Sequence, residues 1–200
     1  MSLFSTAYFP CISYMSAFLK DENPIIEVHD SYQKQTYRNR CKVLTSNGVQ
    51  TLSVPIKKIH GERIETCEAL ISYDDPWQQI HRRCLESAYK SSPYFEHYYS
   101  YLSPIFKSRP ERLLIDLNDK IMEVLLKMLK ADKPIVHTET YEKEAPSDFR
   151  NLFNSKQAID GKAFQPYYQV FNYKFDFIAD LSILDLIFNE GPESINLLGC

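Results

Sequence analysis

This chain of 200 residues has little glycine, no long hydrophobic run and no surplus of positive charge. Five glycines are too few for flexible linkers or collagen-like repeats. No run approaches the roughly 18 uninterrupted apolar residues of a membrane span, and the amino terminus lacks the basic segment that opens a signal peptide. The net charge of −3 excludes a polycation that binds nucleic acid or membranes through its overall charge. We expect one soluble, cored domain over residues 1–200, with no membrane span and no nucleic-acid partner.

Paired cysteines are also missing. The five cysteines are odd in number and widely scattered, and none forms a CxxC pair. This spacing fits neither a disulfide framework nor a zinc site, so we expect free thiols, no metal ligands and a cytoplasmic location. No Walker loop, Rossmann glycine fingerprint, HExxH or GxSxG occurs, and the cofactor therefore stays unknown.

Positive charge is concentrated within residues 31–63. Against the single acid Glu62, this segment carries Lys34, Arg38, Arg40, Lys42, Lys57, Lys58 and Arg63. One interpretation is a pair of solvated hairpin strands that happen to be basic. The other is an anion-binding face for a phosphate or carboxylate, because the Arg guanidinium offers a fixed fork of donors.

Apolar patterning predicts short strands in the first third of the chain, over residues 3–9, 25–29 and 64–73, with one or two helical turns over 12–19. Asn47-Gly48 lies between two alternating runs and predicts a β-hairpin, because both residues tolerate positive φ. These signals place a basic hairpin beside a set of buried strands.

Three consecutive helices are expected in the middle of the chain. Asp75 as N-cap and Pro76 at the first helical position open one, Ser92-Pro93 opens the next, and the last runs over about 111–130. A long surface loop is expected over 140–166 and a further helix over 181–188. The predicted fold class is α/β: a single domain with a mixed sheet flanked by helices and an inserted β-hairpin. Because the central helices are consecutive, α+β is the alternative.

Several separated blocks carry a resemblance to a family. They include Tyr8-Phe9-Pro10, residues 29–34 with 37–40, Thr51 to Pro55, Ala88 to Phe95, Tyr168 to Phe171 and Leu181 to Gly191. In order and spacing they resemble the WbqC-like protein family, bacterial proteins often encoded with genes for O-antigen and other polysaccharide synthesis. The resemblance spans nearly the whole chain. It implies a pathway, sugar or polysaccharide assembly, and does not supply a mechanism.

The predicted catalytic pair is His29 and Asp30. Both follow a buried strand, and ligands of open α/β sheets bind beyond such strand ends. We expect His29 to act as general acid or base and Asp30 to orient it. The alternative is a strand end that Asp30 merely caps.

Four neighbouring side chains are predicted to bind the substrate. Arg38 and Arg40, two apart on a strand, would point the same way and clamp a phosphate together. Tyr32 and Lys34 would complete this site. The alternative is that these side chains are solvent-exposed at the edge of a sheet and bind nothing.

Two further segments offer groups that suit a sugar. Trp77, His81 and Tyr89 share one helix face and could form an aromatic platform, unless that face belongs to the core. Tyr168 and Gln169 could hydrogen-bond sugar hydroxyls, or line the wet face of a strand. We expect the helix face to converge with His29 and Asp30 in one cleft.

These residues favour an enzyme of sugar or polysaccharide biosynthesis, a transferase that moves a group to or from an activated, phosphate-bearing sugar such as a nucleotide sugar. The alternative is a non-catalytic binding or scaffold protein that docks onto a partner enzyme through its Tyr-rich surface. A deep basic cleft favours the enzyme, and a neutral convex surface favours the scaffold. The sequence leaves both alternatives open.

Overall fold

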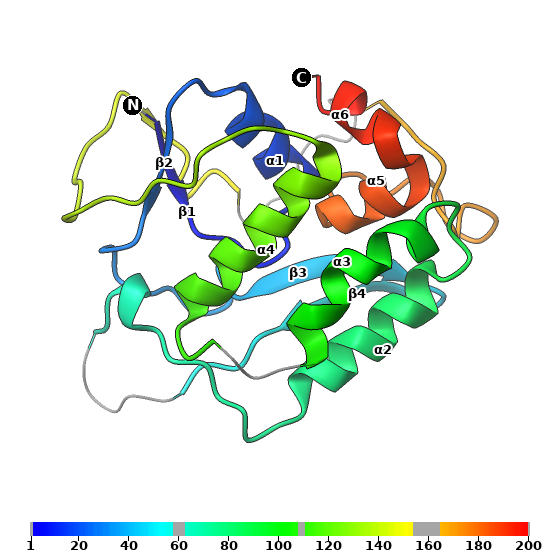
Figure 1. Ribbon diagram of the computed structural model, residues 1–200, viewed down its shortest axis with the longest axis horizontal. Helices are drawn as coiled ribbons and strands as arrows, with labels where there is room; N and C mark the ends of the chain where they lie inside the picture. The colour runs from blue at the N-terminus through cyan, green and yellow to red at the C-terminus, as the bar shows by residue number, and fades with distance from the viewer. Residues whose placement is uncertain (1, 58–62, 108–110, 154–164, 200) are drawn as a thin grey trace.

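The computed structural model describes residues 2–57, 63–107, 111–153 and 165–199 (Figure 1). Its first unit is a small parallel sheet in the order β2-β1-β5, built from β1 (Ser2–Ser5), β2 (Pro24–Glu27) and β5 (Ser147–Asp148). Helix α1 (Ile12–Lys20) connects β1 to β2. The ring of Phe4 on β1 packs edge-on against Tyr14 and Phe18 of α1, which fixes the helix against the sheet.

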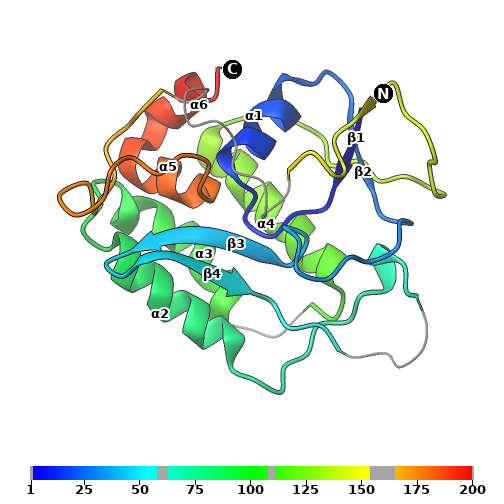
Figure 2. The ribbon, with the colours of Figure 1, turned by 180° about the vertical axis from the view of Figure 1, so that it is seen from behind.

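The predicted hairpin is confirmed. Strands β3 (Arg40–Thr45) and β4 (Gly48–Ser53) pair antiparallel, and Gly48 adopts a φ of +100° at the turn. In Figure 2 the hairpin lies in front of the central helices and apart from β1 and β2. Parallel and antiparallel pairing therefore occur in two separate sheets among the described residues. With the flanking helices they agree with the predicted α/β class, and the α+β alternative is equally consistent with them.

Helices α2 (Trp77–Tyr89) and α5 (Ile183–Glu190) pack against the hairpin. The other helices are α3 (Phe95–Lys107), α4 (Leu114–Leu129), η3 (Gly191–Glu193) and α6 (Ser194–Leu197). Helix α4 contributes a stripe of fully buried side chains, Leu117, Ile121 and Leu125, because its apolar residues recur at helical spacing. None of the described helices has the length and apolar character needed to cross a membrane.

Two local predictions were wrong. Residues 64–73 form no continuous strand but contain the short helix η1 (Thr66–Glu68), because Glu65 and Glu68 form a capping box that closes a helical turn. Helix α2 begins at Trp77, with Pro76 in the capping position, while the carbonyl of Asp75 accepts a hydrogen bond from the Trp77 amide. The predicted loop over 140–166 contains β5, and its residues 154–164 lie outside the described part of the chain.

Candidate functional site

Polar groups gather at the carboxyl end of the parallel sheet. Glu27, the last residue of β2, is fully buried, and its carboxylate accepts hydrogen bonds from the His29 amide, the Thr138 hydroxyl and the Glu142 amide at 2.8–2.9 Å. The guanidinium of Arg150 lies 3.7 Å from the same carboxylate. The segment that leaves β2 is therefore held firmly where ligands of parallel sheets bind.

A polar pocket opens at this edge, and we call it the carboxyl-end pocket. Its volume is about 360 Å³, and it is lined by His29, Asp30, Ser31, Gln33, Tyr141, Arg150 and Asn151. The predicted catalytic pair thus lies beyond a strand end, as the sequence indicated. Arg150 places a positive charge in the same pocket.

Asp30 does not orient His29. Its carboxylate accepts hydrogen bonds from the Arg38 guanidinium and from the hydroxyl of Thr66. Arg38 is only 2% exposed, and a buried guanidinium requires a counter-charge, which Asp30 supplies. The predicted clamp of Arg38 with Arg40 does not form either, since Arg38 precedes β3 and its charge is held inside the molecule.

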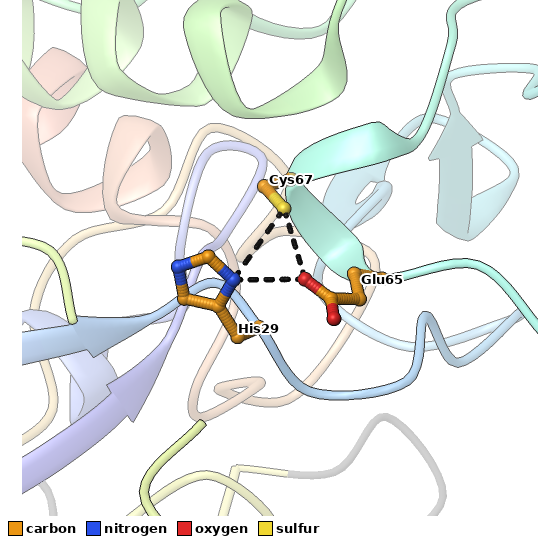
Figure 3. Close-up of side chains that lie close together, drawn as sticks. All are labelled: His29, Glu65 and Cys67. Carbon is orange, nitrogen blue, oxygen red and sulfur yellow. Dashed lines mark hydrogen bonds and ion pairs between the residues drawn. The ribbon is translucent and has the colours of Figure 1, made fainter. Parts of the chain in front are cut away.

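Glu65 is the carboxylate that contacts His29. Its Oε2 lies 2.8 Å from His29 Nδ1, and Cys67 Sγ lies 3.5 Å from the same oxygen and 3.9 Å from Nδ1 (Figure 3). His29 comes from the segment after β2, whereas Glu65 and Cys67 come from η1 and its cap. The hydrogen bond to His29 lowers the pKa of Glu65, and burial together with that carboxylate raises the pKa of Cys67.

This His29–Glu65–Cys67 cluster brings together three kinds of metal-ligating atom, although the cysteine spacing had predicted no metal ligands. All three donor atoms lie within 4.8 Å of one another. Sequence reasoning missed Glu65 and Cys67 because 36 residues separate Glu65 from His29 and because residues 64–73 were expected to form a strand. A single histidine and a single cysteine far apart give no motif that could have found them.

A second and larger cavity lies between the hairpin and the start of α2, and we call it the basic pocket. Its volume is about 590 Å³. It is lined by five of the predicted substrate residues, Tyr32, Lys34, Arg40, Trp77 and His81, together with side chains of β4. The fold thus brings together residues that the sequence placed in two separate blocks.

Three residues that line this pocket each have one buried polar atom without a hydrogen-bond partner among the described residues. The atoms are Arg40 Nε, Trp77 Nε1 and Asn39 Oδ1. Asn39 precedes β3, so strand alternation does not place it on the opposite face from Arg40. Because buried polar groups in folded proteins are nearly always paired, such a group calls for a partner that a ligand can supply.

His81 lies at the base of the basic pocket in a neutral form. It is 3% exposed, and its Nδ1 lies 2.8 Å from the hydroxyl of Tyr8. Burial lowers the pKa of His81 to about 4. At neutral pH this imidazole therefore shapes the pocket wall and carries no charge.

The two pockets share one wall, the segment 31–34. Ser31 and Gln33 face the carboxyl-end pocket, while Tyr32 and Lys34 face the basic pocket. Successive side chains of this segment therefore lie in different pockets. The expected single cleft is therefore divided in two, with His29 on one side of the wall and His81 on the other.

The remaining predicted residues lie outside both pockets. Tyr89 is 1% exposed, and its ring packs 5.2 Å from that of Phe188 in the core. Gln169 is equally buried and donates a hydrogen bond of 2.9 Å to the carboxylate of Asp185 on α5. That carboxylate is itself buried and therefore requires hydrogen-bond donors. Tyr168 is 53% exposed.

Comparison with known proteins gives two matches. The model of the WbqC-like protein family matches residues 6–165, a range that contains both pockets. The chain is also 24% identical to "Uncharacterized protein Rv1507c" of Mycobacterium tuberculosis (strain ATCC 25618 / H37Rv) over 217 residues, which cover 96% of this chain and 91% of that protein. No solved structure matches the chain.

Proposed function

The chain belongs to the WbqC-like protein family, and from this premise we propose that it is an enzyme of sugar or polysaccharide biosynthesis. In this proposal it is a cytoplasmic transferase that moves a group to or from an activated, phosphate-bearing sugar, such as a nucleotide sugar. The observation that carries the proposal is that three residues lining the basic pocket each have a buried polar atom without a hydrogen-bond partner among the described residues.

The chemistry of the basic pocket suits an anionic ligand with a ring. Arg40 and Lys34 supply positive charge, and the unpaired Nε of Arg40 is a donor for a phosphate oxygen. Trp77 supplies an aromatic surface together with a free indole N–H. A volume of about 590 Å³ falls within the range of sites for small molecules.

Group transfer requires places for a donor and an acceptor, and two pockets with one shared wall supply them. In this proposal the basic pocket holds the activated sugar and the carboxyl-end pocket holds the second substrate. His29 is the proton carrier, with Glu65 taking the supporting role first assigned to Asp30. Asp30 instead forms an ion pair with Arg38, which holds in place the start of the segment 31–34.

The proposal is tested by thermal denaturation with nucleotide sugars. We expect these ligands to raise the melting temperature of the wild type, and Arg40→Ala to weaken their apparent affinity at least ~10-fold, because a hydrogen bond to a charged group is lost. The ligand-free melting temperature should change little, since Arg40 forms no ion pair with any described residue. The matched control is Arg83→Ala, which removes the same charge from an exposed position of α2 outside the pocket.

Three outcomes would contradict the proposal. Equal loss in both arginine variants would show a nonspecific effect of charge. A large loss of ligand-free stability in Arg40→Ala, with the ligand response intact, would make Arg40 structural. Absence of any wild-type response would favour the scaffold alternative, for which Tyr168 and Tyr173, 53% and 77% exposed, are the candidate contacts.

A further inference from the structure

Three donor atoms of different chemistry converge at the rim of the carboxyl-end pocket. We propose that His29 Nδ1, a carboxylate oxygen of Glu65 and Cys67 Sγ bind one divalent transition-metal ion, with Zn²⁺ as the best match (Figure 3). The site is assembled from the segment after β2 and from η1.

The distances between the donor atoms suit a common ion. They are 2.8 Å from Nδ1 to Oε2, 3.5 Å from Sγ to Oε2 and 3.9 Å from Sγ to Nδ1. Two ligand atoms of a tetrahedral zinc ion lie about 3.3–3.6 Å apart, given zinc bonds of about 2.0 Å to nitrogen or oxygen and 2.3 Å to sulfur. Shifts of about half an ångström in the side chains would complete that geometry.

The donor set selects the class of ion. Thiolate and imidazole favour zinc and related ions over Ca²⁺ and Mg²⁺, which prefer oxygen ligands. A thiolate and a carboxylate together balance the two charges of the ion. Three protein ligands leave a fourth position for water, as in catalytic zinc sites. The side chain of Glu65 is 50% exposed, so that position has access to solvent.

The backbone holds both arms of the site in place. The Thr66 amide donates to the Asp30 carbonyl and the Cys67 amide donates to the Val28 carbonyl, each at 2.8 Å. The capping box with Glu68 fixes the cap of η1, which includes Glu65. The ligands are therefore positioned before an ion binds, and less ordering entropy opposes binding.

The main competing interpretation is a nucleophilic Cys–His–acid triad. In such a triad the nucleophile and the acid contact opposite ring nitrogens of the histidine. Here Cys67 and Glu65 both lie near Nδ1, and the Cys67 thiol donates a hydrogen bond to the Glu65 carboxylate. An ion bound to all three atoms would replace these hydrogen bonds.

A bound ion would occupy Nδ1 of His29, so the proton-transfer role would pass to a water on the ion, because zinc lowers the pKa of bound water to about 7. Only this proton-transfer role of the bound water rests on the proposed function. Metal binding itself is independent of the sugar, and Arg40→Ala should leave it unchanged. Failure of one proposal can thus be distinguished from failure of the other.

The test uses Co²⁺ as a spectroscopic substitute for Zn²⁺. All proteins carry Cys200→Ser, because Cys200 lies outside the described residues. We expect one Co²⁺ per chain, a thiolate-to-cobalt charge-transfer band and displacement of Co²⁺ by one equivalent of Zn²⁺. Cys67→Ser should abolish the band and weaken Zn²⁺ binding at least ~10-fold. Cys84→Ser, which changes the half-buried thiol of α2, is the matched control and should behave like the parent protein.

A second variant covers the case in which Cys67→Ser fails to fold. Glu65→Gln keeps a side-chain oxygen for the capping box, and it should weaken Zn²⁺ binding at least ~10-fold while the charge-transfer band remains. The proposal is overturned if the parent protein shows no such band, if Cys84→Ser loses it, or if folded Cys67→Ser or Glu65→Gln binds Zn²⁺ as tightly as the parent.

Discussion

At the scale of single residues, His29 and His81 differ because their surroundings bury one imidazole and leave the other partly exposed. His81 is 3% exposed beneath the basic pocket, and burial lowers its pKa to about 4. The side chain of His29 is 28% exposed and lies beside the carboxylate of Glu65. The sequence predicted both as site residues, but the difference in burial arises only when α2 packs against the hairpin.

The buried state of His81 predicts how stability depends on pH. Between about pH 6.5 and 4 the unfolded chain binds a proton at this imidazole that the folded chain does not, so stability falls as the pH is lowered. Between pH 7 and 4.5 the free energy of unfolding should fall by about 2–3 kcal/mol more in the wild type than in His81→Gln. Urea denaturation at both pH values measures this difference.

The control for this prediction is His97→Gln, because His97 is exposed on α3. That variant should keep the wild-type dependence on pH. Parallel pH profiles for the wild type and His81→Gln would show that His81 is protonated equally in both states.

At the scale of elements, turn residues and apolar periodicity predicted the hairpin and the long helices, because neighbouring residues determine those elements. The Asn47-Gly48 turn specified the hairpin, and the apolar stripes of α4 and α5 specified helices close to their observed bounds. The strand over 64–73 was wrong because the capping box of Glu65 and Glu68 outweighs a weak apolar pattern. Capping geometry depends on side-chain contacts that residue periodicity does not express.

The end of α5 supplies a prediction about a glycine. Gly191 has a φ of +56°, and a Cβ added there would lie 2.6 Å from the ring of Tyr94. Gly191→Ala should therefore destabilise the protein by about 2 kcal/mol or more, from backbone strain and overpacking together. Chemical denaturation measures the loss.

Gly48→Ala separates the two contributions. Gly48 also has a positive φ, +100°, but a Cβ there would have nothing within 4 Å. This variant should lose only about 1 kcal/mol, the cost of the left-handed backbone. Equal losses in the two variants would mean that the Tyr94 ring moves aside without cost.

At the scale of the whole molecule, the candidate site depends on segments that meet only in the folded chain. The sequence predicted Tyr32, Lys34, Arg40, Trp77 and His81 as site residues, and the basic pocket contains them all. It could not predict that the segment 31–34 would form a wall, because that division depends on how the hairpin packs against α2. The cluster of His29 with Cys67 was equally hidden, since it requires η1 to dock beside the end of β2.

The reactivity of the cysteine thiols depends on how the whole chain folds, because folding buries some of them and leaves others accessible. The structure describes Cys11, Cys41, Cys67 and Cys84 as free, with the first two buried and the other two half-buried. In a Cys200→Ser protein, a thiol reagent should react first with Cys67 and Cys84. Cys11, with a pKa raised by burial to about 12, and Cys41 should react only as the molecule unfolds.

Absorbance during the reaction with an aromatic disulfide reagent counts these groups. Four equivalents should react in denaturant without any reductant. A lower count would reveal a disulfide and would argue against a reducing compartment. Rapid reaction of all four thiols in the native state would show that the core around Cys11 and Cys41 opens locally.

The wall formed by the segment 31–34 has a thermodynamic consequence. Its side chains alternate between the two pockets, so a displacement of this segment on one side changes the shape of the other. Two ligands that meet through such an element are linked, and linkage is reciprocal. If an anion beside Lys34 raises or lowers the affinity of a ligand beside His29 by some factor, that ligand changes the affinity for the anion by the same factor. Under the proposed function, a ligand bound in one pocket would therefore change the affinity of the other pocket by the same factor, whichever ligand binds first.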